Sequence, residues 1–508
     1  MHSRRSMTGA ITAVLALTAS ACTHGGQNAG AHGGGRDLTV ARPIDVVDLS
    51  PDGSFVRSSD SQVVALIADS LYRIDENDRI EPALAAGMPK VSKDQLAWTI
   101  ELRPGITFSN GSSLTSKDVK FSLENARKGT QQGKLFEPIS SIETPSATTV
   151  VVHTGAKDAT LLWALAGFTA AILPDDFAGM PAQRFYQKPI GAGAYMIAER
   201  KPGVDLKLVR NPHYYGAAPK PDSITFTPVA DRNARMTQLR AGAVNMIEDP
   251  PVEQVPKIKS DSTLRIYSRP IGVMRLGLTT AKPPLNDLHV RRAISLAMDR
   301  TSMVRAVLGG GGSVACSWIN VTFLRGYRPP FGCLVDLNQA KGEMAKSSYP
   351  HGASFSLTYD SGDAQMPLTA QIVQSDLAKI GIQLKLNGTT NQLYKASLAN
   401  RSFQGRFSLF ALPGDPGLSF ANYVDTDAES TSSQLLPQIK QEFEKSTRMF
   451  DEAARFKMYN TIADQIAGNA DAIGMYSPNK VFASTTKISG VKILPTNKVN
   501  FADISVSG

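Results

Sequence analysis

The histidines of this sequence stand too far apart to form a catalytic or metal-binding site by themselves. After residue 36 they occur as His153, His213, His289 and His351, and none lies in an HxxxH, HxH or HExxH pattern. Zinc hydrolases need such paired ligands on one helix face. The sequence also lacks a GxSxG nucleophile elbow and a P-loop. We therefore expect a protein that is not an enzyme and holds no cofactor and no metal.

Two glycines, Gly191 and Gly193, raise the question of a phosphate-binding loop, because glycines let the backbone approach a phosphate closely. The third glycine of a dinucleotide fingerprint is missing at the required spacing, and no helix start follows the pair. We therefore reject a nucleotide site at this position.

Three cysteines define the remaining reactive chemistry, and the first of them, Cys22, ends a segment with the organisation of a lipoprotein signal peptide. Arg4 and Arg5 supply the charged start, and the apolar run Ala10–Ala19 is shorter than the roughly 20 residues that span a bilayer. Small residues precede Cys22, as in a lipobox. We expect residues 1–22 to be a signal peptide and Cys22 to be lipidated; secretion with an unmodified Cys22 is the alternative.

A glycine-rich tether follows the signal peptide over residues 23–36. As a flexible coil it would span about 20 Å, and at full stretch about 45 Å. The sequence therefore predicts a globular protein held by a lipid anchor at the outer face of the cell membrane, in the cell envelope.

The other two cysteines, Cys316 and Cys333, are expected to form a disulfide, because an exported protein matures in an oxidising environment. The bond would stabilise the fold by about 3 kcal/mol. Two buried thiols are the alternative. Metal binding is disfavoured, because no histidine or second cysteine pair stands at ligand spacing.

The composition is ordinary for a globular protein with more than one core, with 508 residues, 42% hydrophobic and 19% charged. The formal net charge is +9, but the basic residues are scattered rather than clustered. This pattern favours a solvated basic surface over nucleic-acid binding.

The stretch Trp98–Ala126 predicts a strand, two turns and a capped helix. Apolar and polar residues alternate from Trp98 to Leu102, which is typical of a half-buried strand. Thr115 is placed to cap a helix, with Asp118 three residues later as in a capping box.

Two further helices are expected from apolar spacing. The run Val63–Tyr72 reads as one apolar helix. A second helix is predicted after Asp287, with Val290, Ile294, Met298 and Val304 on one face, continuing to the glycines at 309–312.

The stretch LRPGITFSNGSSLTSKDVKFS, from Leu102 to Ser122, resembles the signature of the solute-binding proteins that serve peptide, nickel and opine ABC importers. The runs PIGAGAY, VRNPHYYG, NDLHVRRAISLAMDR and LAKIGIQLKL carry the same resemblance. It covers roughly residues 38–507.

Strands and helices alternate throughout, which indicates an α/β or mixed α+β fold. The resemblance implies two lobes of the periplasmic-binding-protein type, joined by a hinge near Ile271–Leu278 and Ala483–Ile488, with an extra subdomain in lobe one. We expect lobe one at 37–75, 189–274 and 485–508, the subdomain at 76–188, and lobe two at 275–484.

The resemblance also implies function. A peptide or peptide-like solute would be enclosed between the lobes of a monomer and delivered to ABC permease subunits in the membrane. The alternatives are a non-peptide solute, such as a metal chelate, an opine-like or modified peptide or a glycan fragment, and a role in envelope assembly without transport.

The ligand class turns on the run Phe410–Pro416. Peptide binders of the family carry W-x-x-D-x-x-D-P, whose first Asp pairs with the peptide ammonium. Aligned on Asp415, this sequence has Phe410 in place of the Trp and Pro413 in place of that Asp. Asp415 is then structural and plain peptides bind weakly; a shifted gap would instead make Asp415 the ammonium ligand.

Six other residues are candidates for ligand contact, each with a structural alternative. Arg401 and Arg406 would meet a ligand carboxylate or be exposed charges at a strand edge. The aromatic candidates would line the cleft or pack in a core or loop; they are Phe55, Trp163, Trp318 and Tyr394.

Overall fold

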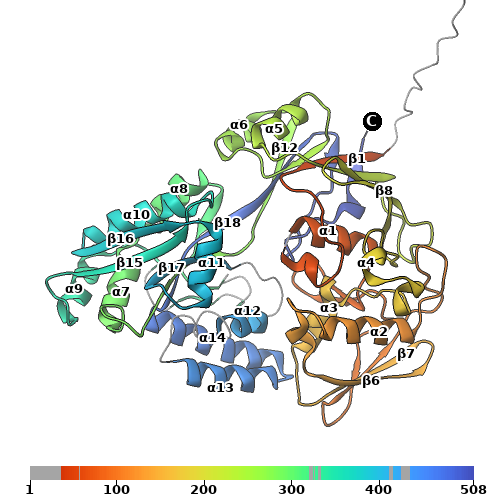
Figure 1. The fold of residues 1–508 in the computed structure, drawn as a ribbon, viewed down its shortest axis with the longest axis horizontal. Helices are drawn as coiled ribbons and strands as arrows, with labels where there is room; N and C mark the ends of the chain where they lie inside the picture. Colours follow the sequence, from red (N-terminus) through yellow and green to blue (C-terminus); the bar gives the residue numbers. More distant parts are fainter. Residues whose placement is uncertain are drawn as a thin grey trace, which may run out of the picture. The chain divides into compact units, whose positions relative to one another are not determined.

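The structure is a computed structural model that describes residues 36–56, 58–319, 324, 327–329, 333–410, 416–424 and 435–507. Cys22, the expected signal peptide and the expected tether lie outside these residues, as do Pro413 and Asp415. The chain is a mixed α/β protein, as the sequence predicts, and its elements are labelled in Figure 1.

The strand nearest the N-terminus, β1 (Asp37–Arg42), lies at the centre of one half of the main sheet. It pairs in parallel with β10 and β11, and β10, β9 and β8 continue antiparallel. Leu38 and Val40 are fully buried against the apolar face of helix α1. The other elements of this half are β8 (Tyr195–Lys201), β9 (Asp205–Arg210), β10 (Ser223–Pro228), β11 (Met246–Glu248), α1 (Ser58–Ile67) and α5 (Arg232–Arg240).

The long strand β18 (Ala472–Thr485) joins the two halves of this sheet. Its first part pairs with β13 (Val273–Leu278) and β14 (Gly312–Val314), and its second part pairs with β11 and β12 (Leu264–Pro270). Figure 1 shows β18 as a single continuous strand in dark blue. The strand order is therefore β16-β15-β17-β13-β18-β11-β1-β10-β9-β8.

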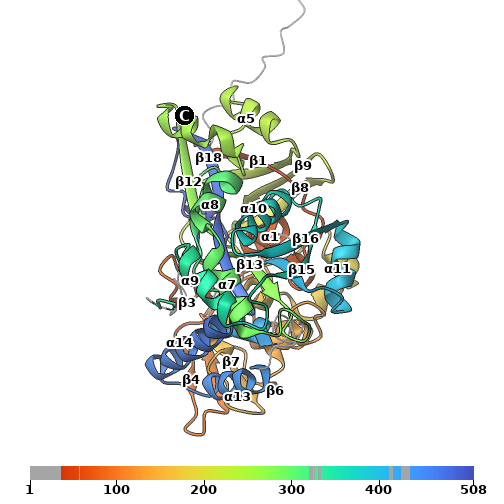
Figure 2. The same ribbon diagram turned by 90° about the vertical axis from the view of Figure 1, so that its left-hand side faces the viewer.

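The second half of the sheet has its own core. Strand β15 is parallel to both β16 and β17. Helix α10 packs on β15 and β16, helix α8 packs on β14 and β18, and α7 packs against α9, as Figure 2 shows from the side. The elements are α7 (Leu288–Ala297), α8 (Arg300–Leu308), α9 (Leu337–Lys346), β15 (Ala353–Asp360), α10 (Met366–Ala378), β16 (Ile382–Thr389), α11 (Asn391–Ala399) and β17 (Gly405–Phe410).

A separate antiparallel sheet has the order β4-β5-β7-β6; helix α2 packs on it, and helix α3 contributes to the same core. The expected capping box is confirmed, since the Thr115 backbone N–H donates to the Asp118 carboxylate at 2.7 Å. The elements are β4 (Lys90–Val91), β5 (Ala97–Glu101), α2 (Ser116–Arg127), β6 (Ile139–Ser146), β7 (Thr149–Thr154) and α3 (Leu161–Ala166).

Three further helices form a small core with Trp318. They are α12 (Pro416–Asn422), α13 (Leu436–Thr447) and α14 (Glu452–Asn469). The short elements are β2 (Tyr72–Ile74), β3 (Ile80–Pro82), α4 (Ala182–Phe185), α6 (Val255–Ser260), β19 (Ile488–Ser489) and β20 (Ser505–Val506). Over the ranges that the structure describes, no helix is both long and apolar enough to cross a membrane.

Two predicted helices are wrong in extent. Helix α1 ends at Ile67, and Tyr72 already belongs to strand β2. The helix predicted after Asp287 is two helices, because Asp299 interrupts it. The Asp299 carboxylate accepts from the Ser302 backbone N–H at 2.9 Å and caps a new helix, α8.

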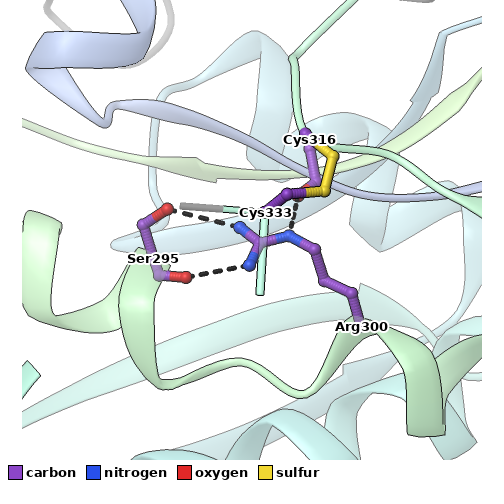
Figure 3. Close-up of a disulfide and its surroundings, with 5 residues drawn as sticks. Ser295, Arg300, Cys316 and Cys333 are labelled. Atoms are coloured by element: carbon purple, nitrogen blue, oxygen red, sulfur yellow. Dashed lines mark hydrogen bonds between the residues drawn. A yellow bond between two sulfur atoms is a disulfide. The ribbon is translucent and has the colours of Figure 1, made fainter. Parts of the chain in front are cut away.

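The expected disulfide is confirmed: Cys316 and Cys333 are bonded, with their Cα atoms 4.7 Å apart (Figure 3). Beside it lies the buried guanidinium of Arg300, which donates to the Ser295 carbonyl at 3.0 Å and to the Gly474 carbonyl at 2.8 Å. Burial lowers the pKa of Arg300 to about 10. The disulfide therefore lies beside the start of α8.

Candidate functional site

The candidate site is a cavity of about 1120 Å³ between helix α1, strand β2, helix α3 and the C-terminal segment 492–503. Ligand pockets for small molecules usually measure about 300–1,000 Å³. The cavity is therefore large enough to hold a molecule that consists of several amino-acid residues. Its lining also includes the segment 214–220 and, from the strands that cross between the sheet halves, Lys480.

Several aromatic side chains form part of the cavity wall. Trp163 of α3 is 9% exposed, and Phe168 follows it closely in the chain. Tyr214 and Tyr215 face the cavity from another segment, with ring centroids 5.0 Å apart. Such rings offer flat apolar surface to the carbon skeleton of a ligand.

One lining carboxyl group, that of Asp69, lies just beyond the end of α1. It accepts a hydrogen bond from the Tyr215 hydroxyl at 2.8 Å. Burial raises the pKa of Asp69 to about 6, against the opposing effects of this hydrogen bond and of Arg73.

Most charged side chains of the lining are paired with opposite charges of the protein. Arg73 contacts Glu81 at 2.6 Å, and Lys492 contacts Glu76 at 2.7 Å. Lys480 contacts Glu248 and, at 3.3 Å, Asp249. These cations are therefore already neutralised within the fold.

Lys498 is a lining cation with a different environment. Its Nζ donates to the Ser61 hydroxyl at 2.8 Å and lies 4.4 Å from the centroid of the Phe168 ring. Burial, together with the positive charge of Arg42, lowers the pKa of Lys498 to about 7.

The position of Lys498 is fixed by a reciprocal pair of hydrogen bonds beside it. The Gln62 side chain accepts from the Val499 backbone N–H at 2.7 Å and donates to the Val499 carbonyl at 3.0 Å. A tight turn before it, in which Asn497 has a positive φ of 61°, reverses the chain. The C-terminal segment is therefore fastened to α1 at the cavity.

The sequence-predicted site residues are distributed over several places. Trp163 is among the residues that line the cavity. Trp318 is 1% exposed and packs on Phe420 and Tyr423 in the core of the last helices. The Tyr394 hydroxyl donates to a backbone carbonyl of β17.

The two predicted arginines differ from each other in exposure. Arg406 lies on β17, is 4% exposed and has its guanidinium 5.5 Å from the Phe403 ring, so the alternative of an exposed strand-edge charge is wrong for it. Arg401 is exposed, with a positive φ of 52°. Neither belongs to the cavity lining. The Phe55 and Phe410 side chains, Pro413 and Asp415 lie outside what the structure describes.

Sequence reasoning missed Gln62, Asp69, Tyr215 and Lys498 as site residues. The run VRNPHYYG, quoted above for the family resemblance, contains Tyr215 and was the available signal. Lys498 gave none, because it is one cation among many in a basic chain. Its role depends on a contact with Ser61, which is more than 400 positions away in the sequence.

Several known proteins are similar to this chain in sequence or in fold. The family model described as bacterial extracellular solute-binding proteins, family 5 Middle, matches residues 79–431. Protein XP55 of Streptomyces lividans is 29% identical over 76% of this chain and 73% of its own length. The probable D,D-dipeptide-binding periplasmic protein DdpA of Escherichia coli is 26% identical over 80% of this chain and 81% of its own.

A similar solved structure is that of NikA from Brucella suis in complex with Fe(III)-EDTA. It superposes with a TM-score of 0.84 at 21% identity, and covers 93% of this chain and 100% of its own. At this identity the similarity shows the fold, which is that of the two-lobe periplasmic binding proteins.

Proposed function

Because the chain belongs to the bacterial extracellular solute-binding proteins of family 5, we propose that it captures a peptide or peptide-like solute and delivers it to an ABC permease. The observation that carries this proposal is the cavity of about 1120 Å³, which has several aromatic side chains in its wall. The similarity to the D,D-dipeptide-binding relative supports a short peptide as the solute.

The proposed mechanism is closure of two lobes over the solute. Strand β18 pairs with β11 and β12 along one part and with β13 and β14 along the other. Lobe one would comprise 37–75, 189–274 and 485–508, with the subdomain at 76–188, and lobe two 275–484. A solute that contacts both lobes stabilises the closed form by its differential affinity for that form.

A non-peptide solute is the second candidate, supported by the fold similarity to NikA, which was solved with a metal chelate. Asp415 distinguishes the two. If it pairs with a peptide ammonium, Asp415→Asn should weaken the binding of free peptides several hundredfold, equivalent to about 3–5 kcal/mol. If Asp415 is structural, the variant should have a lower melting temperature than wild type but the same affinity for peptides.

Membrane attachment through Cys22 is the remaining part of the proposal. A Cys22→Ala variant expressed in the native cell should be shed or kept as precursor, whereas wild type should partition into detergent. Recovery of wild type in the aqueous phase with an unmodified N-terminus would contradict the lipid anchor.

The test of the function itself is mass spectrometry of small molecules released from the purified, denatured protein. We expect peptides or peptide-like compounds in stoichiometric amount. Release of a chelate, an opine or a glycan fragment would favour the second candidate. A protein that carries nothing and binds no solute would favour a role in envelope assembly, against which an adjacent permease–ATPase operon would argue.

A further inference from the structure

Lys498 is a half-buried cation of the cavity lining that has no acidic partner within the described part of the chain. Arg73 and Lys492 each contact a glutamate, and Lys480 contacts two acids. The Lys498 ammonium, in contrast, hydrogen-bonds only the neutral hydroxyl of Ser61 within the described part of the chain. The charged side chain that affects the pKa of Lys498 is another cation, Arg42.

An ammonium in this position is unfavourable unless a negative charge joins it. Taking a cation out of water costs several kcal/mol, which a counter-ion and its hydrogen bonds offset. Arg42 cannot help, because it carries the same charge and its own partner is the Glu248 carboxylate at 3.3 Å. The fold therefore retains a cation whose electrostatic partner is missing.

The cavity has room for a negatively charged group beside the Lys498 ammonium. Lys498 and Ser61 both line it, so an incoming group can meet the ammonium and the hydroxyl together. Phe168 also lines the cavity, with its ring centroid 4.4 Å from the Lys498 Nζ. Its ring therefore supplies an apolar surface next to the charge. A ligand with an anionic end and a carbon skeleton suits these neighbours.

We propose that Lys498 anchors a carboxylate of the solute in this cavity, with the Ser61 hydroxyl as a second donor. This inference rests on the proposed solute-binding function and names the chemical class of the solute as a carboxylic acid. A carboxylate fits better than a phosphate, because one ammonium and one hydroxyl match a single charge shared by two oxygens. Phosphate groups are usually held by arginine forks or several backbone N–H groups.

The anchor is held in place independently of its own side chain. The Gln62 amide fixes the neighbouring residue, Val499, through both its N–H and its carbonyl. A substitution of the Lys498 side chain leaves this pair of hydrogen bonds intact. The variant should therefore fold, and its binding can be measured.

The experiment uses a casein digest of peptides below 1 kDa and the same digest after methyl esterification, which removes the carboxylates. Wild-type protein, freed of ligand by unfolding and refolding, is mixed with each digest, and retained compounds are identified by mass spectrometry after gel filtration. We expect wild type to retain free acids at least tenfold more than their esters. A hydrogen bond to a charged group corresponds to about ten- to hundredfold in affinity.

The variants Lys498→Met and Lys498→Arg complete the design. The first should lose the preference for acids by the same factor, and the second, which keeps a cation, should restore most of it. Lys457→Met, at an exposed position of α14, is the control and should behave as wild type. Equal retention of acids and esters by wild type would contradict the carboxylate anchor at Lys498, and so would an unchanged preference in Lys498→Met. Neither result would contradict the proposed solute-binding function.

Two other outcomes would also contradict the proposed carboxylate anchor. If wild type retains neither digest, both the anchor and the proposed peptide function are contradicted. If inorganic phosphate at millimolar concentration displaces the retained acids from wild type, the site selects phosphate and the carboxylate assignment is wrong.

Discussion

Replacing Glu248 by glutamine should destabilise the protein through the charges that it leaves behind. Glu248 ends strand β11 and is 4% exposed. One carboxylate oxygen contacts Arg42 of β1 at 3.3 Å, and the other contacts Lys480 of β18. Glutamine keeps the size but removes the negative charge, and it replaces one accepting oxygen with an NH2 group that cannot accept from a cation. Two buried cations would then face each other across three strands.

The expected loss is about 3 kcal/mol of unfolding free energy at pH 7. Breaking a buried ion pair by removing one partner costs about 3–5 kcal/mol. We take the low end, because Lys480 keeps its contact with Asp249 at 3.3 Å and Arg42 keeps a hydrogen bond to the Ser59 carbonyl at 3.2 Å.

The pH dependence gives a second measure of the same interaction. Burial alone would raise the pKa of Glu248, but the attraction of Lys480 and Arg42 outweighs it and the pKa lies below its ordinary value. For an acid with a lowered pKa, the stabilisation is present above the unfolded pKa and is lost as the pH falls. The difference between wild type and variant should therefore shrink below about pH 4.5.

Urea unfolding, followed by circular dichroism at pH 7 and at pH 3.5, measures both effects. Glu253→Gln is the matched control, because Glu253 is exposed a few residues further along the chain, and it should change the unfolding free energy by no more than about 0.5 kcal/mol. A loss below about 1 kcal/mol for Glu248→Gln at pH 7 would refute the reasoning.

Three further predictions follow from individual contacts. Gly193→Ala should destabilise the fold by about 3 kcal/mol in urea unfolding, because the added Cβ would lie 2.5 Å from the Leu66 carbonyl oxygen; a neutral result would contradict this. Serine at both Cys316 and Cys333 should remove about 3 kcal/mol, and peptide mapping of wild type without reductant should give one linked pair rather than two alkylatable thiols. Asp69→Asn should raise the melting temperature at pH 7.5 but not at pH 4. The raised pKa of this acid, about 6, means that stability is lost as the pH rises from about 4 to 6, and equal effects at both pH values would exclude this cause.

The sequence alone determined the elements whose signals are local. Thr115 and Asp118 predict a helix start, because a capping box needs only residues three apart, and that start is observed. The family resemblance also reached the correct fold class, since its motifs are contiguous runs that keep their order. The cysteine pair is a similar case, because only two cysteines follow the expected signal peptide and they have one intramolecular pairing available.

Periodicity failed where a polar residue or a neighbouring element decided the outcome. The apolar spacing from Val290 to Val304 continues through Asp299, yet the Asp299 carboxylate caps a new helix there. The rejected nucleotide loop at Gly193 has a packing explanation, because glycine lets the chain pass against the end of α1. That close approach involves residues more than 120 positions apart and leaves no local trace.

The candidate site is where tertiary structure decided most. Trp163 and Trp318 were equal candidates in the sequence, but the fold places the first on the cavity and the second in a core. Lys498 carries no motif, and its neighbours Ser61 and Phe168 come from distant parts of the chain. Whether a lysine is a solvated surface charge or a cation awaiting a partner depends on its burial and on the charges around it. Those quantities exist only once the chain has folded.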